Sequence, residues 1–379
     1  MRIALILGVI HLLVFLSLQA ALLTAESATA QLLSTHKTEV AIALIRNQSQ
    51  LSADSIIRRA RALPFYSVLF IFALFFQFVL LLDAMRNKNT IQIIGLYLFH
   101  LLSLGYSVMQ VLQTRNIIAS DLISSQLHDM VPDYSATANL PLSVTIVALM
   151  AISVLFLWTY TTYKLYKEFG WQVFKQIGAD LRMRKMYMVY QIFITILKFD
   201  VFMLLAFSTQ WLIMLVDQAE NPGSSSYGDF SQVIIHSIVS VGGSVVMLIL
   251  AYWAIRTERT WAMIVFIIAD LATVGYFISK LVFMQPPYVT IGVQCIPGWP
   301  PESCDRYDGS RNFFTLFLST DIVLGLVTAG IAVKALMNFN KGLLPHVDLR
   351  RRKGGWFNCN GDVQMVDIEA QPPKRWTID

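Results

Sequence analysis

Charged residues are scarce in this sequence. Asp, Glu, Lys and Arg together make up 14% of the chain, whereas a soluble domain carries about 25%. Hydrophobic residues make up 56% of the chain, and the mean hydropathy is +0.58. A chain of this composition has too few charged side chains to cover a soluble fold of its size. The composition therefore excludes an ordinary soluble domain and predicts an all-α, polytopic membrane protein.

Cysteines are few, and the common catalytic motifs are absent. Three cysteines are too few for a disulfide-rich fold or a zinc ribbon. The sequence has no glycine-rich phosphate loop, no dinucleotide-binding fingerprint, no HExxH or CxxC metal pattern and no GxSxG elbow. The segments between the hydrophobic runs are too short to fold into a catalytic domain. We therefore expect no enzyme activity, no cofactor and no metal site.

The net charge of +5 would suggest nucleic acid in a soluble protein. In a membrane protein, basic residues concentrate in cytosolic loops, where they set the topology and contact anionic lipid headgroups. We therefore expect the lipid bilayer as the partner of this chain, with anionic headgroups among its contacts, and no nucleic acid.

Long hydrophobic runs make up most of the sequence. A run of about 20 apolar residues crosses a bilayer as a helix. The first run, 3–23, either spans the membrane or is a cleaved signal peptide with small residues at 28–30, which would leave seven spans. We favour a retained helix. The eight expected spans lie at about 3–23, 64–84, 91–112, 141–163, 189–215, 233–255, 260–284 and 313–336.

These runs divide the chain into three parts. Residues 1–63 hold the first hydrophobic helix or signal and a lumenal segment, 64–336 form the transmembrane bundle, and 337–379 form a tail. Most Lys and Arg residues fall on one side if both termini of the eight-span form are cytosolic, which favours that topology.

Several features then fall on the lumenal side. Asn47 begins an N-glycosylation sequon, and we expect it to be glycosylated. Cys295 and Cys304 share one lumenal loop, where a disulfide between them can persist. Three arginines on this side have no explanation beyond contact with headgroups: Arg58, Arg59 and Arg61.

The longest predicted cytosolic loop, 164–188, has apolar residues at every fourth position from Leu165. This pattern predicts an amphipathic helix that lies along the membrane face or packs onto the bundle. The tail carries a basic patch that either binds acidic lipid or a trafficking partner, or only fixes the topology. The expected lipid-facing basic residues are Lys164, Lys167, Lys175 and Arg182 in the loop, and Arg350, Arg351, Arg352 and Lys353 in the tail.

Two blocks of sequence are distinctive. They are "LLDAMRNKNTIQIIG" (81–95) and "YKEFGWQVFKQIGADLRMRKMYMVYQIFITILKFDVF" (166–202). Both resemble an uncharacterised family of fungal multi-pass Golgi apparatus membrane proteins, and the likeness continues to "MNFNKGL" (337–343). The resemblance implies a Golgi membrane location and a fungal source. It implies no reaction and carries over no catalytic residue.

Six ionisable residues within the predicted spans are the candidates for a functional site, because a charge near the bilayer centre costs at least ~2.5 kcal/mol. Lys198 and Asp200 are two residues apart, so they point about 200° away from each other on a helix and cannot pair. Matching depths instead predict Lys198 with Asp270, and Lys280 with Asp321. Asp200 then has only His100 as a candidate neighbour. The six form the predicted buried charge network: His100, Lys198, Asp200, Asp270, Lys280 and Asp321.

A structural interpretation of these charges is also open. Polar side chains hold transmembrane helices together, and a lysine side chain can extend to the headgroups. Three functions therefore remain possible. We favour a Golgi membrane organiser or trafficking factor that acts through the loop and the tail. The alternatives are a small-solute or proton-coupled transporter that uses the buried charges, and a seven-helix receptor or sensor.

Overall fold

The computed structural model describes residues 2–46, 53–118, 139–177, 181–220, 242–285 and 311–342, and every regular element in these ranges is a helix. Seven helices are long and apolar enough to cross a membrane, and a further apolar helix is shorter. The predicted all-α membrane bundle is confirmed. Its elements are α1 (Arg2–Thr35), α2 (Lys37–Arg46), α3 (Ala53–Asn87), α4 (Thr90–Ile118), α6 (Asn139–Ile152), the π-helical turn η2 (Ser153–Trp158), α7 (Thr159–Ile177), α8 (Leu181–Glu220), α10 (Gly243–Thr257), α11 (Thr260–Phe283) and α12 (Arg311–Met337).

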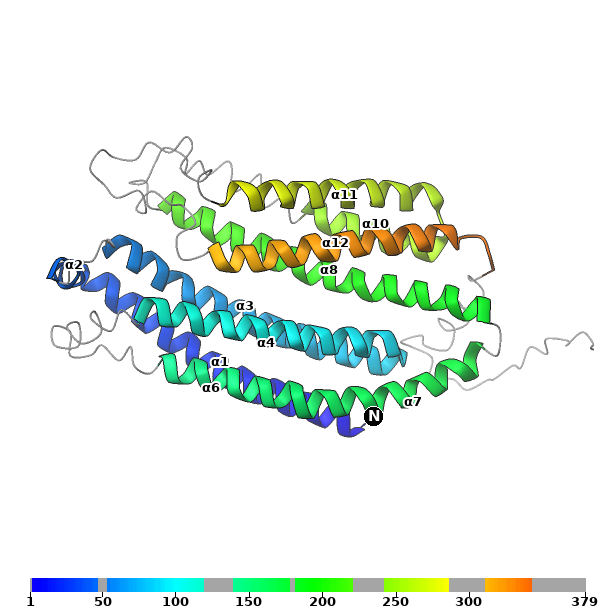
Figure 1. The fold of residues 1–379 in the computed structure, drawn as a ribbon, viewed down its shortest axis with the longest axis horizontal. Coiled ribbons are helices and arrows are strands. Elements are labelled where there is room, and N and C mark those ends of the chain that lie inside the picture. Colours follow the sequence, from blue (N-terminus) through cyan, green and yellow to red (C-terminus); the bar gives the residue numbers. More distant parts are fainter. Residues whose placement is uncertain are drawn as a thin grey trace, which may run out of the picture.

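The long helices run side by side along the long axis of the molecule (Figure 1). The start of α1 and the end of α12 lie at the same end of the bundle, which is the predicted cytosolic end (Figure 1). Two tight turns lie at this end, after α3 and after α10. Each turn contains a residue in the left-handed conformation, Lys88 and Glu258, both with φ of 49°.

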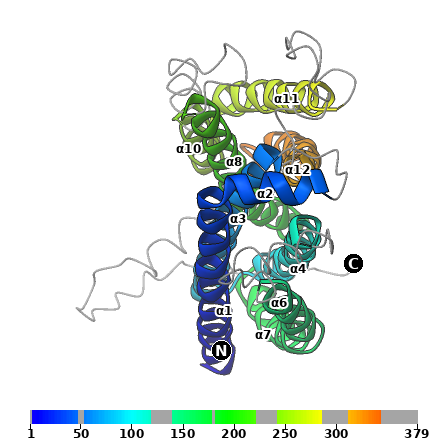
Figure 2. The same cartoon turned by 90° about the vertical axis from the view of Figure 1, so that its left-hand side faces the viewer.

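The bundle consists of two halves, which are visible end-on in Figure 2. The N-terminal half contains α1, α3, α4 and the continuous α6–η2–α7 helix, in which α1 packs on α3 and α4 packs on α3 and α6. The C-terminal half contains α8, α10, α11 and α12, in which α12 packs on both α8 and α11. The halves meet where α3 and α4 face α8 and α12.

Apolar residues cover both the inside and the outside of the bundle. The largest core cluster joins the two halves, from Leu22 and Phe70 to Met203 and Phe317. Large hydrophobic side chains such as Val79 and Val323 are exposed on the outer helix faces. An apolar outer surface is what a lipid environment requires, because the solvent of these faces is hydrocarbon.

The first helix is longer than the sequence pattern predicts. α1 continues to Thr35, and the candidate cleavage region at 28–30 lies inside it, with Thr29 and Ala30 buried. The retention of this helix stays a prediction. α3 likewise begins at Ala53, so the three unexplained arginines belong to its first turns; Arg59 is half-buried and Arg61 is exposed. The side chain of Arg58 lies outside the described part of the chain.

The segment 164–188, expected to be one amphipathic helix, contains parts of two described helices. The first part of the loop continues the span as α7 to Ile177, and α8 already begins at Leu181. Leu165 and Phe169 are buried in a cluster with α3 and α4, which fits the interpretation that this segment packs onto the bundle. Both flanking spans thus extend beyond their apolar segments into this loop. A position of the loop along the membrane face stays a prediction.

The side chains of the basic residues in this region are described for some positions and not for others. Lys164 and Lys167 are exposed, and each lies over a tyrosine ring of its own helix. Arg182 is exposed in the first turn of α8, and Lys175 lies in α7 with no described side chain. The predicted glycosylation site, disulfide and basic tail all lie outside the described residues: Asn47, Cys295, Cys304, Arg350, Arg351, Arg352 and Lys353.

Candidate functional site

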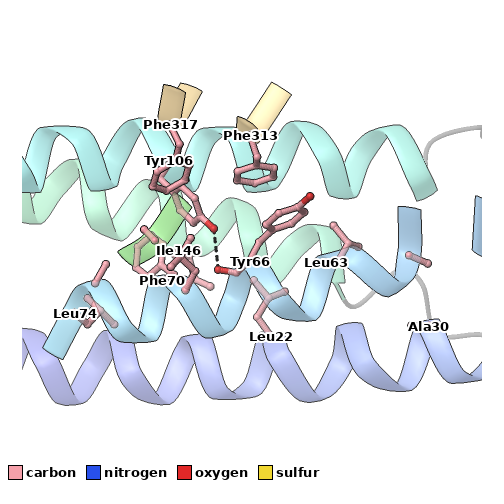
Figure 3. Close-up of a cluster of buried hydrophobic side chains, with 14 of the residues drawn as sticks. Leu22, Ala30, Leu63, Tyr66, Phe70, Leu74, Tyr106, Ile146, Phe313 and Phe317 are labelled. Carbon is pink, nitrogen blue, oxygen red and sulfur yellow. Dashed lines mark hydrogen bonds between the residues drawn. The ribbon is translucent and has the colours of Figure 1, made fainter. Parts of the chain in front are cut away.

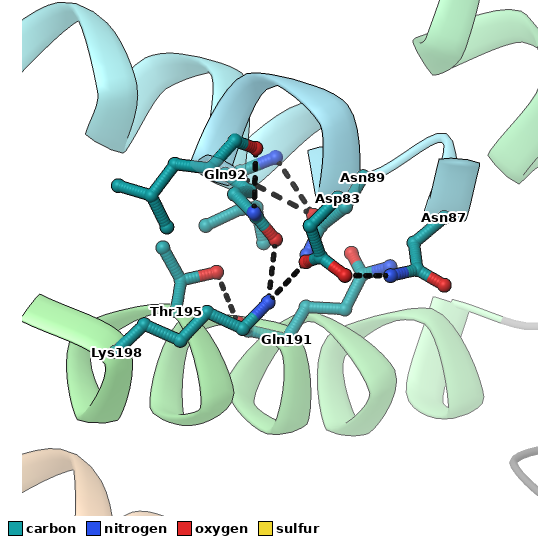
Figure 4. Close-up of polar contacts among 9 residues, drawn as sticks. Asp83, Asn87, Asn89, Gln92, Gln191, Thr195 and Lys198 are labelled. Carbon is teal, nitrogen blue, oxygen red and sulfur yellow. Dashed lines mark hydrogen bonds and ion pairs between the residues drawn. The ribbon is translucent and has the colours of Figure 1, made fainter. Parts of the chain in front are cut away.

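A charged contact joins the two halves near the predicted cytosolic end (Figure 4). Lys198 on α8 donates hydrogen bonds to Asp83 Oδ2 on α3 at 2.5 Å and to Gln92 Oε1 on α4 at 2.8 Å. The Lys198 and Asp83 side chains are 31% and 35% exposed. We call Asp83, Gln92 and Lys198 the clamp, because they connect three helices across the boundary between the halves.

Local structure around the turn after α3 positions the clamp. Asn89 caps α4 by accepting a hydrogen bond from the Ile91 backbone N–H at 3.0 Å. Asn87 donates to Asp83 Oδ1 at 2.7 Å, and Gln92 donates to the Leu80 carbonyl at 2.9 Å. These bonds hold the acceptor oxygens of Asp83 and Gln92 toward α8.

A glycine brings α4 close to α8 beside the clamp. A Cβ at Gly95 would lie 2.7 Å from the Phe199 ring and 3.2 Å from the Thr195 side chain. A larger residue at this position would therefore push the halves apart. The close approach and the clamp both involve the two distinctive blocks, since Gly95 ends the first and Phe199 lies in the second.

Lys198 and Asp200 face different neighbours, as helix geometry predicts, but the predicted partner of Lys198 was wrong. Lys198 pairs with Asp83 and not with Asp270. The depth of Lys198 was measured from an assumed entry at Val189, whereas α8 begins at Leu181. Sequence reasoning missed Asp83, although a carboxylate in the last turns of a span is a usable signal for a charged contact.

Three carboxylates lie close together within the C-terminal half. Asp200 on α8 interacts electrostatically with Asp270 on α11 and with Asp321 on α12. Thr328 donates a hydrogen bond to Asp200 Oδ2 at 2.9 Å. Gly325 lets α11 approach α12, because a Cβ there would lie 2.6 Å from Val274 and 3.6 Å from Asp270 Oδ1.

This cluster has no cation among the described residues. The Oδ2 atoms of Asp270 and Asp321 are buried, and neither has a hydrogen-bond partner there. No described lysine or arginine forms an ion pair with any of the three carboxylates. Within the same residues, no group of three His, Cys, Asp or Glu side chains could hold a metal ion. Packing of the surrounding helices, rather than ion pairing, keeps these carboxylates together.

The two remaining pairings were also wrong. Lys280 Nζ lies 4.6 Å from the centre of the Trp211 ring and 5.4 Å from that of Tyr276, and it forms no ion pair with Asp321. His100 does not contact Asp200. Its ring lies 4.0 Å from that of Trp158 and 5.3 Å from that of His11, centre to centre. The predicted network is therefore divided among four separate places in the fold.

A small pocket, with a cavity volume of about 30 Å³, lies between the two halves. Its walls come from α3, α4, α8 and α12, and most are leucine, phenylalanine, alanine and methionine side chains. Three hydroxyl groups also line it, from Ser103, Tyr106 and Thr320. An apolar lining with a few polar groups is typical of a small-molecule site, but such sites measure about 300–1,000 Å³. A ligand would therefore fit here only after the halves move apart. None of the six predicted charges lines the pocket.

Aromatic side chains cross the boundary of the halves toward the predicted lumenal end, and Figure 3 shows Tyr66, Tyr106, Phe313 and Phe317 close together. The rings of Tyr66 and Phe313 stack with centres 3.8 Å apart, and Tyr106 lies 5.1 Å from Phe313 and 5.8 Å from Phe317. Tyr106 also donates a hydrogen bond to the Tyr66 carbonyl at 3.0 Å. These four rings join α3 and α4 of one half to α12 of the other.

A second group of rings separates the pocket from the clamp. Phe76 stacks on Phe202 with ring centres 4.8 Å apart, and Phe99 lies 5.7 Å from Phe199. The pocket thus lies between two sets of contacts that cross the boundary of the halves. One set consists of these rings and the clamp, and the other consists of the four rings at the predicted lumenal end.

The comparisons with known proteins agree with the resemblance of the two blocks. No family profile and no solved structure matches the chain. The chain is 24% identical over 299 residues to a UPF0658 Golgi apparatus membrane protein of Schizosaccharomyces pombe, and the aligned part covers 74% of this chain and 77% of that relative. The clamp joins the same two blocks, with Asp83 and Gln92 in the first and Lys198 in the second. This chain is a multi-pass membrane protein that is similar to a fungal family of Golgi apparatus membrane proteins, as the blocks predicted.

Proposed function

We propose that this protein is a carrier of the Golgi membrane that binds an apolar or amphipathic molecule in the pocket between its two halves. The observation that carries this proposal is the position of the pocket. It lies at the boundary of the halves and between two sets of contacts that cross this boundary. Opening one set while the other stays closed would expose the pocket to one side of the membrane at a time.

The lining of the pocket defines the class of substrate. The apolar walls suit a hydrocarbon chain or ring system, and the hydroxyls of Ser103, Tyr106 and Thr320 suit one polar group. A charged solute would meet no opposite charge in this lining. We therefore propose a transporter whose substrate is lipid-like and not a small charged solute. The buried charges do not bind this substrate.

The experiment is photolabelling with a fatty acid that carries a diazirine in its chain. The purified full-length chain in nanodiscs is labelled, and the modified peptides are mapped by mass spectrometry. We expect labelling at the pocket helices, and a drop of at least fivefold in Ala73→Phe, because that side chain would fill the pocket.

The matched control is Val79→Phe, on the same helix but exposed on the outer face. It should leave the labelling of the pocket unchanged. Equal labelling of the pocket peptides in wild type and Ala73→Phe would contradict the proposal, provided that both proteins elute as single species in gel filtration.

Transfer is tested by restraining the halves. In a chain whose three cysteines are replaced, Asp83→Cys and Lys198→Cys place one thiol on each side of the clamp. A short bifunctional thiol reagent should then stop the movement of a fluorescent lipid between the leaflets of proteoliposomes, with binding retained. Each single-cysteine protein is the control, and transfer at the same rate after cross-linking would count against a moving carrier.

A membrane-organising or trafficking role is the second candidate. One observation favours it: α7 exposes Tyr160 and Tyr163 with Lys164 and Lys167 beside them. Exposed aromatic and basic side chains are typical of a headgroup-binding surface. Removal of 346–379, combined with lysine-to-glutamate changes on α7, should mislocalise an organiser while lipid transfer in proteoliposomes is unchanged. Normal Golgi localisation of this variant would argue against the organiser.

A further inference from the structure

A row of polar side chains is buried along α4, on the face that meets α1 and α3. The row is His100, Ser103, Ser107, Gln110 and Thr114, and the spacing of three and four residues places all five on one side of the helix. Each is at most 6% exposed. Buried polar residues are costly in a membrane helix and mark ion or proton pathways.

The facing helices contribute matching polar groups. His11, Gln19 and Glu26 on α1 are 6%, 0% and 1% exposed, and Ser67 and Gln77 on α3 are 0% and 3% exposed. We call these five residues and the five of α4 the polar seam. Sequence reasoning missed most of it, because serine and glutamine are not ionisable and Glu26 lies beyond the predicted end of the first span.

Hydrogen bonds connect the seam near the predicted lumenal end. Ser67 donates to Glu26 Oε2 at 2.7 Å, and Gln110 donates to Ser67 Oγ at 3.1 Å. Gln19 donates in turn to Gln110 Oε1 at 3.3 Å. Four side chains from α1, α3 and α4 therefore form one chain of hydrogen bonds.

The other part of the seam contains two histidines with defined roles. His100 Nδ1 lies 2.8 Å from the Leu96 carbonyl, so it donates its proton there and leaves Nε2 as an acceptor. Trp158 donates to His11 Nδ1 at 3.4 Å, which leaves the proton of His11 on Nε2. Two adjacent rings thus supply one donor and one acceptor. Gln77 lies beside them and donates to Ser103 Oγ at 2.6 Å.

Several atoms of the seam are buried without a hydrogen-bond partner among the described residues. They are His11 Nε2, His100 Nε2, Thr114 Oγ1 and the Oε1 atoms of Gln19, Glu26 and Gln77. Buried polar atoms in proteins are satisfied by protein groups or by ordered water. Ordered water bound at these atoms would connect the hydrogen-bonded residues along the seam.

We propose that the polar seam conducts protons through the N-terminal half, between His11 and His100 at one end and Glu26 at the other. The distance from His11 to Glu26 is about 22 Å at 1.5 Å per residue, which covers most of a hydrocarbon core of about 30 Å. Each step moves one proton between an adjacent donor and acceptor, and no electron is transferred.

The seam also touches the pocket. Ser103 belongs to the seam through its bond with Gln77, and it lines the pocket as well. Proton movement along the seam could thereby drive binding or release of a substrate. This coupling rests on the proposed function, whereas proton conduction itself does not.

The titratable neighbours of the seam lie mainly at its ends. Tyr66 and Tyr106 interact electrostatically with each other, and Tyr106 also interacts with Glu26. Arg59 and Arg61 lie farther along α3 toward the lumenal end, and α2 beyond α1 carries Lys37 and Glu39. The ion pair of Asp83 and Lys198 lies at the opposite end of the bundle.

The test uses the purified full-length chain in proteoliposomes loaded with a pH-sensitive dye, with a membrane potential set by potassium and valinomycin. We expect proton flux well above that of protein-free liposomes. Glu26→Gln and His100→Phe should each lower it at least fivefold. The matched controls, Glu39→Gln and His36→Phe, change partly exposed residues of the same types outside the seam and should leave the flux unchanged. If the wild-type protein gave no more flux than protein-free liposomes, the proposal would be overturned. It would also be overturned if both seam variants kept the flux of the wild type.

A third variant separates conduction from folding. Thr114→Val removes a buried hydroxyl that has no partner and keeps the side-chain shape, so it should not lower the thermal stability. Reduced flux at unchanged stability supports conduction, and unchanged flux in a folded Thr114→Val protein counts against it. The flux assay needs no substrate, so the two experiments are independent. A negative flux result would not affect the photolabelling result, and negative photolabelling would not affect the flux result.

Discussion

The two halves of the bundle bury polar groups in opposite ways. In the N-terminal half, neutral hydroxyl and amide groups bond to one another across three helices, as Gln110 does with Ser67 and Gln19. In the C-terminal half, three carboxylates lie near one another, and a single hydrogen bond is described for them, from Thr328 to Asp200.

This difference teaches what holds each half together. Side-chain hydrogen bonds contribute on average about 0.6 kcal/mol each between transmembrane helices, and the N-terminal half has several in sequence along one seam. The C-terminal half relies on close apolar contact, such as that of Gly325 with Val274, and on the rings of Phe207, Phe277 and Phe314. The clamp and the pocket lie where these two kinds of packing meet.

The largest expected effect comes from a side chain at Gly325. Gly325→Leu would place atoms against Val274, a β-branched residue that cannot rotate away easily, and we expect a loss of about 3 kcal/mol in the free energy of unfolding. Gly330→Leu is the matched control on the same helix, because a Cβ there has no neighbour within 4 Å. Thermal unfolding in detergent is the measurement, and equal midpoints for the two variants would show that close packing does not hold this half.

The clamp has the next largest expected effect. Lys198→Asp and Asp83→Lys should each lower the free energy of unfolding by about 1–2 kcal/mol, between the values for exposed and buried ion pairs. The double variant should recover at least half of the loss in the thermal unfolding midpoint, because the opposite charges would face each other again. As a control, Lys198→Asp with Asp270→Lys should recover nothing, since these residues do not pair. Recovery in the control double variant alone would show that Lys198 pairs with Asp270 and not with Asp83.

The smallest expected effect compares one polar group from each half. Gln77→Leu removes the bond to Ser103 and should lower the free energy of unfolding by about 0.6 kcal/mol. Asp321→Asn keeps the shape of a side chain whose Oδ2 has no described partner, so we expect a change below about 0.5 kcal/mol. Both are measured as thermal midpoints of the purified proteins. A larger loss in Asp321→Asn than in Gln77→Leu would reverse the contrast between the halves.

The sequence predicted the spans because the length of an apolar run is a local property. The predicted runs fall within described helices, with one exception. Of the sixth run, 233–255, only the part from Gly243 onward is described as a helix. The helix ends were less predictable. α1 and α8 extend well beyond their apolar segments, because helix formation continues wherever the backbone bonds can form and the side chains find contacts.

Partners were the part that sequence reasoning could not supply. The sequence ordered residues by depth along single helices, and its helical period correctly separated Lys198 from Asp200. It could not say which helices are neighbours, so Asp83 was overlooked and Asp270 was chosen instead. The seam was missed for a related reason, since the bonds between its members join residues 26 to 91 positions apart in the chain.

By itself, the sequence determined that this chain is an all-α membrane protein, that Lys198 and Asp200 point to opposite sides of one helix, and that two of its blocks resemble Golgi membrane proteins. Only the tertiary structure decided that those blocks meet at the clamp, that a pocket lies between the halves, and that the polar groups of α1, α3 and α4 form one seam. The reason is physical. Apolarity and helical period are properties of a segment, whereas the neighbour of a side chain depends on how all the helices pack together.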